Sequence, residues 1–176
     1  MLQHVLESAL RQTMNRLVRP VLNPAVPVPL QRRIVRQAYR SSTPPRGAKF
    51  ENITIGGVPA TRTTFGNDPR GAVLYLHGGG YIIGSSSTHR GITGHLAKTT
   101  GCAIVTPDYR LAPEFPFPAA LDDAEACWNG LLEAGLKPDQ IAVAGDSAGG
   151  GLSVALAMRL RDKGLQLPAS LTAFSP

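Results

Sequence analysis

The feature of this sequence that most constrains its fold is the alternation of short apolar runs with helical stretches after residue 47. Apolar runs fit for buried strands cover residues 71–77, 103–107, 141–145 and 169–174, and helical stretches cover 87–99, 119–133 and 147–163. Two alternating segments, 50–55 and 60–65, precede them and are separated by Gly56 and Gly57, which predicts a hairpin. Strands that alternate with helices at this spacing predict an α/β fold, with a mostly parallel sheet and helices on both faces.

The first 45 residues have a different texture and are predicted to form a separate helical segment. Apolar residues at helical spacing predict an amphipathic helix over residues 2–18, ending before Pro20. Residues 20–29 contain four prolines and are predicted not to form a regular helix, whereas 30–40 form a second short helix and 41–47 a linker. We therefore divide the chain into a lid segment, 1–45, and a core, 46–176. A transit peptide and a membrane-surface helix remain alternatives for the first helix.

Composition narrows the classes of function. The 176 residues are 43% hydrophobic, and no run of 18 apolar residues occurs, so stable membrane insertion is not expected. The net charge of +6 is concentrated in residues 1–50, which hold nine basic residues and one acid. We interpret this excess as a solvated helix face and expect no nucleic-acid partner, because no aromatic ladder accompanies it; a polyanion site is the alternative. Cys102 and Cys127 lack metal-binding spacing and are expected to be buried free thiols.

The first motif that carries chemistry is Gly145-Asp146-Ser147-Ala148-Gly149, which fits the pattern G-x-S-x-G. An apolar strand enters the motif and a helix leaves it, as a nucleophile elbow requires. The flanking glycines leave room for strand and helix to converge on a strained turn. We therefore predict Ser147 as a nucleophile, and the alternative is a tight turn with an idle serine.

The second motif, His77-Gly78-Gly79-Gly80, directly follows the strand predicted over 71–77. Acyl transfer creates an oxyanion, which backbone amides can stabilise if they are fixed in advance and the backbone can approach closely. We predict the amides of Gly79, Gly80 and Ala148 as these donors, and His77 as a structural brace of the loop. A phosphate-binding loop is excluded, because neither glycine-rich phosphate motif is present.

Together with DYRLAPE at 108–114 and PFPAALDD at 116–123, these motifs resemble the hormone-sensitive-lipase family of α/β-hydrolases. The resemblance runs from about residue 50 to the end, and it implies that residues 1–45 are a helical cap. It implies a carboxylesterase or lipase-like hydrolase that acts on small ester substrates, a reaction that needs no cofactor. No metal cluster appears in the sequence, and because it shows neither a signal-peptide pattern nor a disulfide framework, we expect a cytoplasmic protein. A homodimer is allowed for the full-length form. The resemblance also implies that Asp108, Arg110, Glu114, Asp122 and Asp123 brace loops, and that Asp146 is not the catalytic acid.

One part of the expected machinery has no counterpart in the sequence. A serine nucleophile needs a base oriented by a carboxylate, and in α/β-hydrolases both follow the serine. After Ser147 the chain offers only Asp162 and no histidine; His4, His77, His89 and His95 all precede it and are expected to be structural. We therefore expect an inactive fragment that lacks carboxyl-terminal strands. The alternative is a non-catalytic ligand binder on the same fold, similar to plant gibberellin receptors.

Overall fold

The central feature of the fold is one six-stranded sheet. The computed structural model describes residues 12, 16, 19–21, 23–39 and 42–176. The strands lie in the order β1-β2-β4-β3-β5-β6, and β4, β3, β5 and β6 run parallel to one another, whereas β1 and β2 form an antiparallel hairpin. Their bounds are β1 Ala48–Ile55, β2 Val58–Phe65, β3 Ala72–Leu76, β4 Ala103–Pro107, β5 Ile141–Asp146 and β6 Ser170–Phe174.

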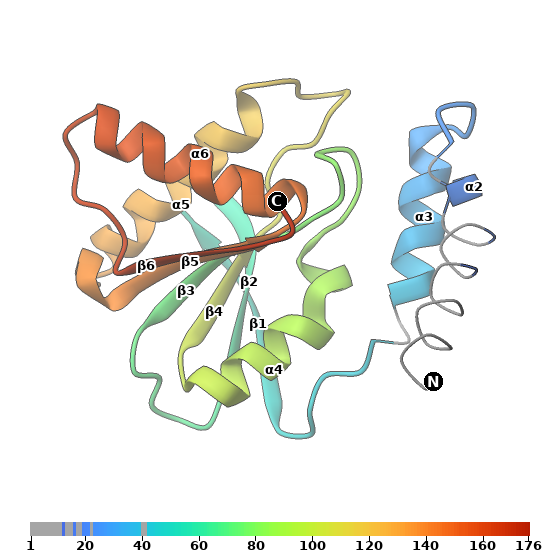
Figure 1. Ribbon diagram of the computed structural model, residues 1–176. Helices are drawn as coiled ribbons and strands as arrows, with labels where there is room; N and C mark the ends of the chain where they lie inside the picture. The colour runs from blue at the N-terminus through green and yellow to red at the C-terminus, as the bar shows by residue number, and fades with distance from the viewer. Residues whose placement is uncertain (1–11, 13–15, 17–18, 22, 40–41) are drawn as a thin grey trace, which may run out of the picture.

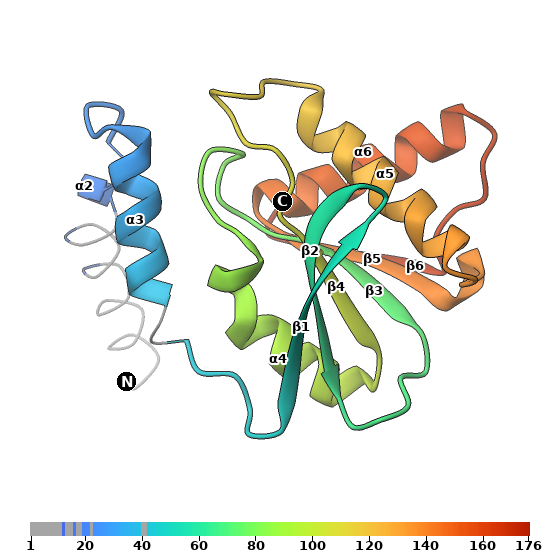
Figure 2. The same ribbon diagram turned by 180° about the vertical axis from the view of Figure 1, so that it is seen from behind.

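Helices cover both faces of the sheet, as Figures 1 and 2 show. One face carries α4, whereas α5 and α6 lie side by side on the other, and α3 stands at the side of the sheet beyond the loops. The helical elements are α2 Arg19–Val21, α3 Val28–Ala38, η3 Ser86–His89, α4 Arg90–Thr100, α5 Ala119–Glu133, η4 Pro138–Gln140 and α6 Ala148–Asp162. The chain thus forms a three-layer α/β structure, which confirms the predicted fold class.

The apolar runs become the central strands because both faces of these strands are covered. Every residue of β3 and β4 is buried, whereas the outer strand β1 alternates between half-buried and exposed positions. Beneath α5 and α6 the core is built around Trp128 and Leu156, and beneath α4 it is built around Tyr75 and Ile104. The central parallel strands are therefore continuous apolar runs in the sequence, whereas apolar and polar residues alternate in the outer hairpin.

Most of the predicted elements after residue 47 are confirmed within two or three residues. The hairpin turns at Gly56 and Gly57, both with positive φ, and α5 has the predicted bounds. The helical region predicted over 87–99 begins with a hydroxyl cap. Ser85 provides it, because its side chain accepts from the Thr88 amide while Thr88 Oγ1 accepts from the Ser85 amide. The sequence predicted one helix there, and the structure has a 3₁₀ turn followed by α4.

One prediction for the amino-terminal part is corrected by the structure. Residues 20–29 were expected to lack regular helix, yet α2 contains Pro20, and α3 begins at Val28 with Pro29 in its first turn. Proline is tolerated there because the first amides of a helix have no intrahelical acceptor. The helix predicted over residues 2–18 lies largely outside the described residues.

Both cysteines are free thiols. Cys127 is buried, whereas Cys102, which lies between the end of α4 and the start of β4, is half-buried. The prediction of two buried thiols is therefore wrong for Cys102. Among the described residues, no helix combines the length and the apolar character needed to cross a membrane.

Candidate active site

The first part of the candidate site is the turn between β5 and α6, where Ser147 stands. Its backbone has φ 50° and ψ −124°, a conformation that costs energy in any residue with a side chain. The turn is tight because a Cβ at Gly145 would overlap the Gly149 carbonyl, and one at Gly149 would overlap the carbonyls of Leu76 and His77. The glycines therefore allow α6 to start directly against the end of β3.

Two backbone hydrogen bonds hold Ser147 in this strained conformation. Its amide donates to the Phe174 carbonyl oxygen of β6 at 2.8 Å, and its carbonyl accepts from the Gly151 amide at 3.1 Å. Ser147 thus lies at the carboxyl end of β5 and directly before the first residue of α6, with Ala148 opening that helix. The positive end of the helix dipole faces this position and favours negative charge.

The second part is the glycine-rich turn at the end of β3. Because β3 and β5 are neighbouring parallel strands with Leu76 opposite Gly145, this turn and the elbow lie at the same edge of the sheet. Gly79 and Gly80 have φ 130° and 59°, and the Ile82 and Ile83 amides both donate to the Gly79 carbonyl oxygen. No described residue accepts a hydrogen bond from the amides of Gly79 or Gly80. These two donors are therefore available to a ligand, as is the first amide of α6 at Ala148.

Asp146 ties the two parts together. Its Oδ1 accepts from the Gly78 amide at 3.0 Å and from the Tyr75 hydroxyl at 2.8 Å, and it lies 3.5 Å from His89 Nε2. Burial would raise the pKa of Asp146, but the contacts with His89 and Tyr75 outweigh it and lower this pKa to about 2. The carboxylate is therefore ionised and engaged behind the glycine turn, and among the described residues it makes no contact with the Ser147 side chain.

His77 is fully buried beneath the same turn. Its Nδ1 lies 2.9 Å from the Gly78 carbonyl oxygen, its ring stacks on Tyr109 with centroids 4.2 Å apart, and its backbone carbonyl accepts from the Tyr109 hydroxyl. Burial lowers the pKa of His77 to about 4, so the ring is neutral and donates through Nδ1. Its Nε2 has no partner among the described residues. The ring is therefore placed as a support of the loop.

The charged residues of the DYRLAPE and PFPAALDD segments are engaged in local contacts. Arg110 pairs with Asp123 at 2.7 Å, Glu114 pairs with Arg32 at 2.7 Å, and Asp122 pairs with Arg159 at 2.6 Å. Asp108 instead accepts hydrogen bonds from the amide and hydroxyl of Ser86. All five of these side chains, four carboxylates and one guanidinium group, thus have partners.

The structure gives no described histidine that could act as a base for Ser147. His89 is buried and held by Ser85, Thr88 and Asp146, whereas His95 is exposed on α4 rather than the satisfied structural residue that was expected. Asp162 pairs with Arg161 at the far end of α6, and His4 lies outside the described residues. No group of three or more histidine, cysteine, aspartate or glutamate side chains among the described residues could hold a metal ion.

Two functional neighbours were missed by the sequence analysis. Arg32 reaches the glycine turn from α3, fifty residues away in sequence, and Tyr75 holds Asp146 from the middle of β3. Tyr75 sits in a strand that already reads as buried, and Arg32 sits in a helix with several exposed arginines, so neither carried a distinguishing signal. Contacts of this range are set by the tertiary fold.

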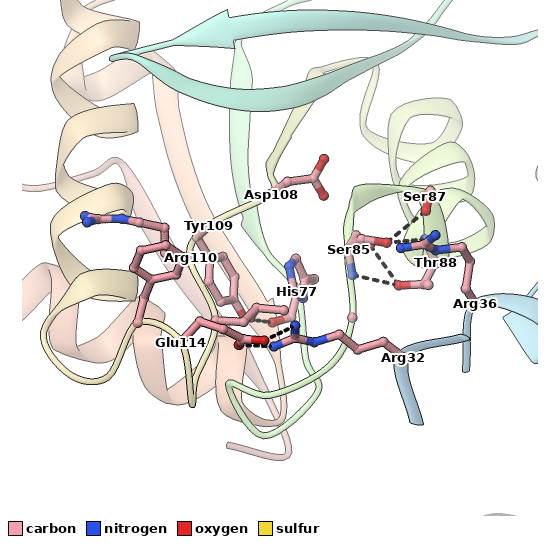
Figure 3. Close-up of a pocket in the computed structure, with 13 residues that line it drawn as sticks. Arg32, Arg36, His77, Ser85, Ser87, Thr88, Asp108, Tyr109, Arg110 and Glu114 are labelled. Atoms are coloured by element: carbon pink, nitrogen blue, oxygen red, sulfur yellow. Dashed lines mark hydrogen bonds and ion pairs between the residues drawn. The ribbon is translucent and has the colours of Figure 1, made fainter. Parts of the chain in front are cut away.

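A cavity of about 580 Å³ lies between α3 and the loops that follow β3 and β4 (Figure 3). Its polar lining includes Arg32, His77, Asp108 and Glu114, but neither Ser147 nor the predicted oxyanion donors. A smaller and mostly apolar cavity of about 250 Å³ is lined by Tyr81 of the glycine turn and by Leu152 and Ala155 of α6. The lining of this smaller cavity likewise includes neither Ser147 nor the predicted oxyanion donors.

A serine elbow and a glycine turn at neighbouring strand ends of a parallel sheet define an α/β-hydrolase. A family model described as alpha/beta hydrolase fold matches residues 73–176, more than half of the chain. A solved esterase of the bacterial hormone-sensitive lipase family is 39% identical, with a TM-score of 0.86, over 95% of this chain and 57% of that one. The chain belongs to the α/β-hydrolases, and the solved structures to which it is similar include members of the hormone-sensitive lipase family.

Named relatives agree with this assignment. An acetyl-hydrolase of Streptomyces hygroscopicus is 43% identical over 70% of this chain and 42% of its own length. The esterase LipU of Mycobacterium tuberculosis is 38% identical over 90% of this chain and 56% of its own length. The chain thus spans about half the length of the curated relatives it matches.

Proposed function

We propose that the protein carrying this sequence is a serine carboxylesterase, with Ser147 as nucleophile and the amides of Gly79, Gly80 and Ala148 as oxyanion donors. The observation that supports this most directly is the shared edge of the sheet. Ser147 occupies a strained turn at the end of β5, and two amides without acceptors among the described residues lie in the turn at the end of the neighbouring strand β3. The names of the relatives, esterase and acetyl-hydrolase, support the ester as substrate class.

The reaction proposed for these residues has two steps. Ser147 Oγ attacks the ester carbonyl carbon, its proton passes to a general base, and the amides stabilise the oxyanion until the alcohol leaves with a proton from that base. Water then attacks the acyl-enzyme by the same route, which releases the carboxylic acid and returns the proton to Ser147. Because no described histidine reaches Ser147, the proposal takes the base and its orienting acid from sequence outside residues 1–176. The 176-residue chain alone is then expected to be inactive.

The test is hydrolysis of a short-chain p-nitrophenyl ester by the natural full-length protein. Ser147→Ala is expected to lower kcat by roughly 10⁶ and to abolish labelling by a fluorophosphonate, since the attacking oxygen is gone. Ser87→Ala removes an exposed hydroxyl from η3 and is expected to change neither readout. Activity and labelling that survive in Ser147→Ala would exclude the proposal.

A non-catalytic ligand binder on the same fold is separated from the esterase by the same reagents. A binder would take up a small ester or acid without turnover, and its Ser147 would not react with the fluorophosphonate even in the full-length protein. Labelling with turnover therefore decides for the esterase.

We further propose that residues 1–45 form the cap of this site, that the protein acts in the cytoplasm, and that the full-length form is a homodimer. The contacts of Arg32 with the loops of the core support the cap, and two free thiols fit a reducing compartment. Fractionation of cells and light scattering of the full-length protein test the location and the oligomeric state. We expect no binding to DNA, even at low salt, where electrostatic binding to nucleic acid is strongest.

A further inference from the structure

The guanidinium group of Arg32 joins α3 to the loops of the candidate site with four hydrogen bonds. Its Nε donates to the Ile82 carbonyl oxygen at 2.8 Å, and its Nη2 donates to the Ala112 carbonyl oxygen at 2.9 Å. Nη1 and Nη2 also bind the two oxygens of Glu114 at 2.9 and 2.7 Å (Figure 3). Only about a quarter of the side chain is exposed. A planar group with donors in a fixed fork suits such a junction, and a lysine could replace only part of it.

Both backbone acceptors of Arg32 belong to segments that hold the glycine turn. The Ile82 and Ile83 amides donate to the Gly79 carbonyl oxygen at 3.1 and 3.0 Å, so Ile82 closes the turn on one side and accepts from Arg32 on the other. The Ala112 amide donates to the Tyr81 carbonyl oxygen at 2.8 Å, which ties the turn to the second loop. Arg32 therefore fixes the turn and its neighbouring loop relative to each other.

The turn needs such support because its own conformation is unfavourable. Gly79, Gly80 and Tyr81 all have positive φ, and for Tyr81, with φ 62°, this backbone carries a steric cost. Strained segments of this kind persist only where surrounding contacts over-determine them. On one side Asp146 holds the Gly78 amide, and on the other side Arg32 holds Ile82.

We propose that Arg32 is a positioning residue, through which docking of α3 sets the geometry of the Gly79 and Gly80 amides. This inference rests on the proposed function, because it assigns those amides to the oxyanion. Arg32 does not touch the reacting atoms. It makes the amino-terminal segment a structural partner of the oxyanion turn in addition to a cover of the site.

The first experiment compares kinetics of full-length variants. Arg32→Ala is expected to lower kcat by about 10- to 100-fold with little change in KM, because a displaced oxyanion turn loses interactions that form in the transition state. Arg32→Lys and Glu114→Gln keep part of the junction and are expected to fall between this variant and the wild type. Arg33→Ala is the matched control, since Arg33 is exposed and has no partner among the described residues. Millimolar guanidinium ion is expected to restore part of kcat in Arg32→Ala alone.

The second experiment does not depend on activity. Hydrogen exchange of the Ile82 and Ile83 amides reports opening of the turn, and it is expected to be about tenfold faster in Arg32→Ala than in Arg33→Ala. Circular dichroism establishes that the variants are folded, and Arg32→Lys serves if Arg32→Ala is not. Unchanged exchange in a folded variant, or a rise in KM with kcat unchanged, would overturn the inference. Faster exchange in a protein without ester hydrolysis would leave Arg32 as the holder of the turn and reject the proposed function instead.

Discussion

At the scale of single residues, Asp146 joins the turn at Ser147 to the glycine turn, and its contribution to the stability of the fold is expected to depend on pH. Its folded pKa of about 2 lies below the ordinary value of 3.8, so its contribution to stability is present above about pH 4 and is lost as the pH falls toward 2. Asp146→Asn is expected to destabilise the chain by on the order of 1–2 kcal/mol at pH 6, and by less at pH 3. Urea unfolding at pH 6 and pH 3 measures the difference in unfolding free energy between the wild type and the variant. If this difference is no smaller at pH 3, the charge of the carboxylate is not what stabilises the contact between the two turns.

Gly149 and Gly151, both in the first turns of α6, provide a matched pair of glycine-to-alanine substitutions. An alanine at Gly149 would drive its Cβ into the carbonyls of Leu76 and His77, whereas one at Gly151 meets only the Tyr81 hydroxyl at 3.5 Å, an ordinary contact. Gly149→Ala is expected to cost roughly 2–4 kcal/mol of unfolding free energy, because a backbone must shift. Gly151→Ala is expected to be neutral or to stabilise the chain by up to about 1 kcal/mol, as alanine favours helix. Equal losses in thermal or urea unfolding would contradict this close approach of α6 to β3.

At the scale of elements, the pairing of α5 with α6 depends on a charged cluster as well as on the core. Arg159 of α6 binds Asp122 and Glu125 of α5 at 2.6 and 3.2 Å, and Lys163 adds a further bond to Glu125. The Lys163 bond and the Arg159 bond hold the pKa of Glu125 below its ordinary value although burial opposes them. The cluster is half-buried, so it is screened less than a pair on the open surface.

Arg159→Gln is therefore expected to lower the unfolding free energy by about 1 kcal/mol, and less in 1 M salt. Arg161→Gln is the control, since Arg161 is exposed and, among the described residues, forms an ion pair only with its neighbour Asp162; we expect a change within about 0.5 kcal/mol. The comparison fails if both variants lose the same stability in urea.

The helices and strands were also the part of the structure that could be predicted best from the sequence. The strands β3 and β4 were predictable because burial on both faces leaves a continuous apolar run, and the helix α5 because burial of one face leaves a helical period. The same reasoning placed Ser147 and the glycines, since a strained turn and a close approach restrict the residue type. It failed at Arg32 and at the first turn of α3, because a long-range contact leaves no period and proline is tolerated where amides are unpaired. The strand order was not predicted for the same reason.

For the whole molecule, the two edges of the sheet have different character. β1 and β6 are both edge strands, each paired on one side only, but the apolar side chains of β1 are half-buried, whereas Leu171 and Phe174 of β6 are exposed. An open edge with apolar side chains is a template for pairing with another chain. We expect the 176-residue chain to self-associate through β6 and to bind a hydrophobic dye.

Thr172→Lys is expected to weaken this self-association by about tenfold in dissociation constant, because a charge on an edge strand opposes pairing. Thr54→Lys adds the same charge to β1 at the opposite edge and is expected to leave association unchanged. Sedimentation over a range of concentrations measures both, and equal effects of the two lysines would assign the association to net charge instead of β6.

The bond from the Ser147 amide to the Phe174 carbonyl has a consequence for synthesis on the ribosome. The elbow emerges from the exit tunnel before β6 does, so its amide must wait for a strand that has not yet been released. Until that strand pairs with β5, the backbone at Ser147 lacks one of the two bonds that maintain its strained shape. The nascent polypeptide is therefore expected to complete this strained turn only after β6 has emerged and paired with β5.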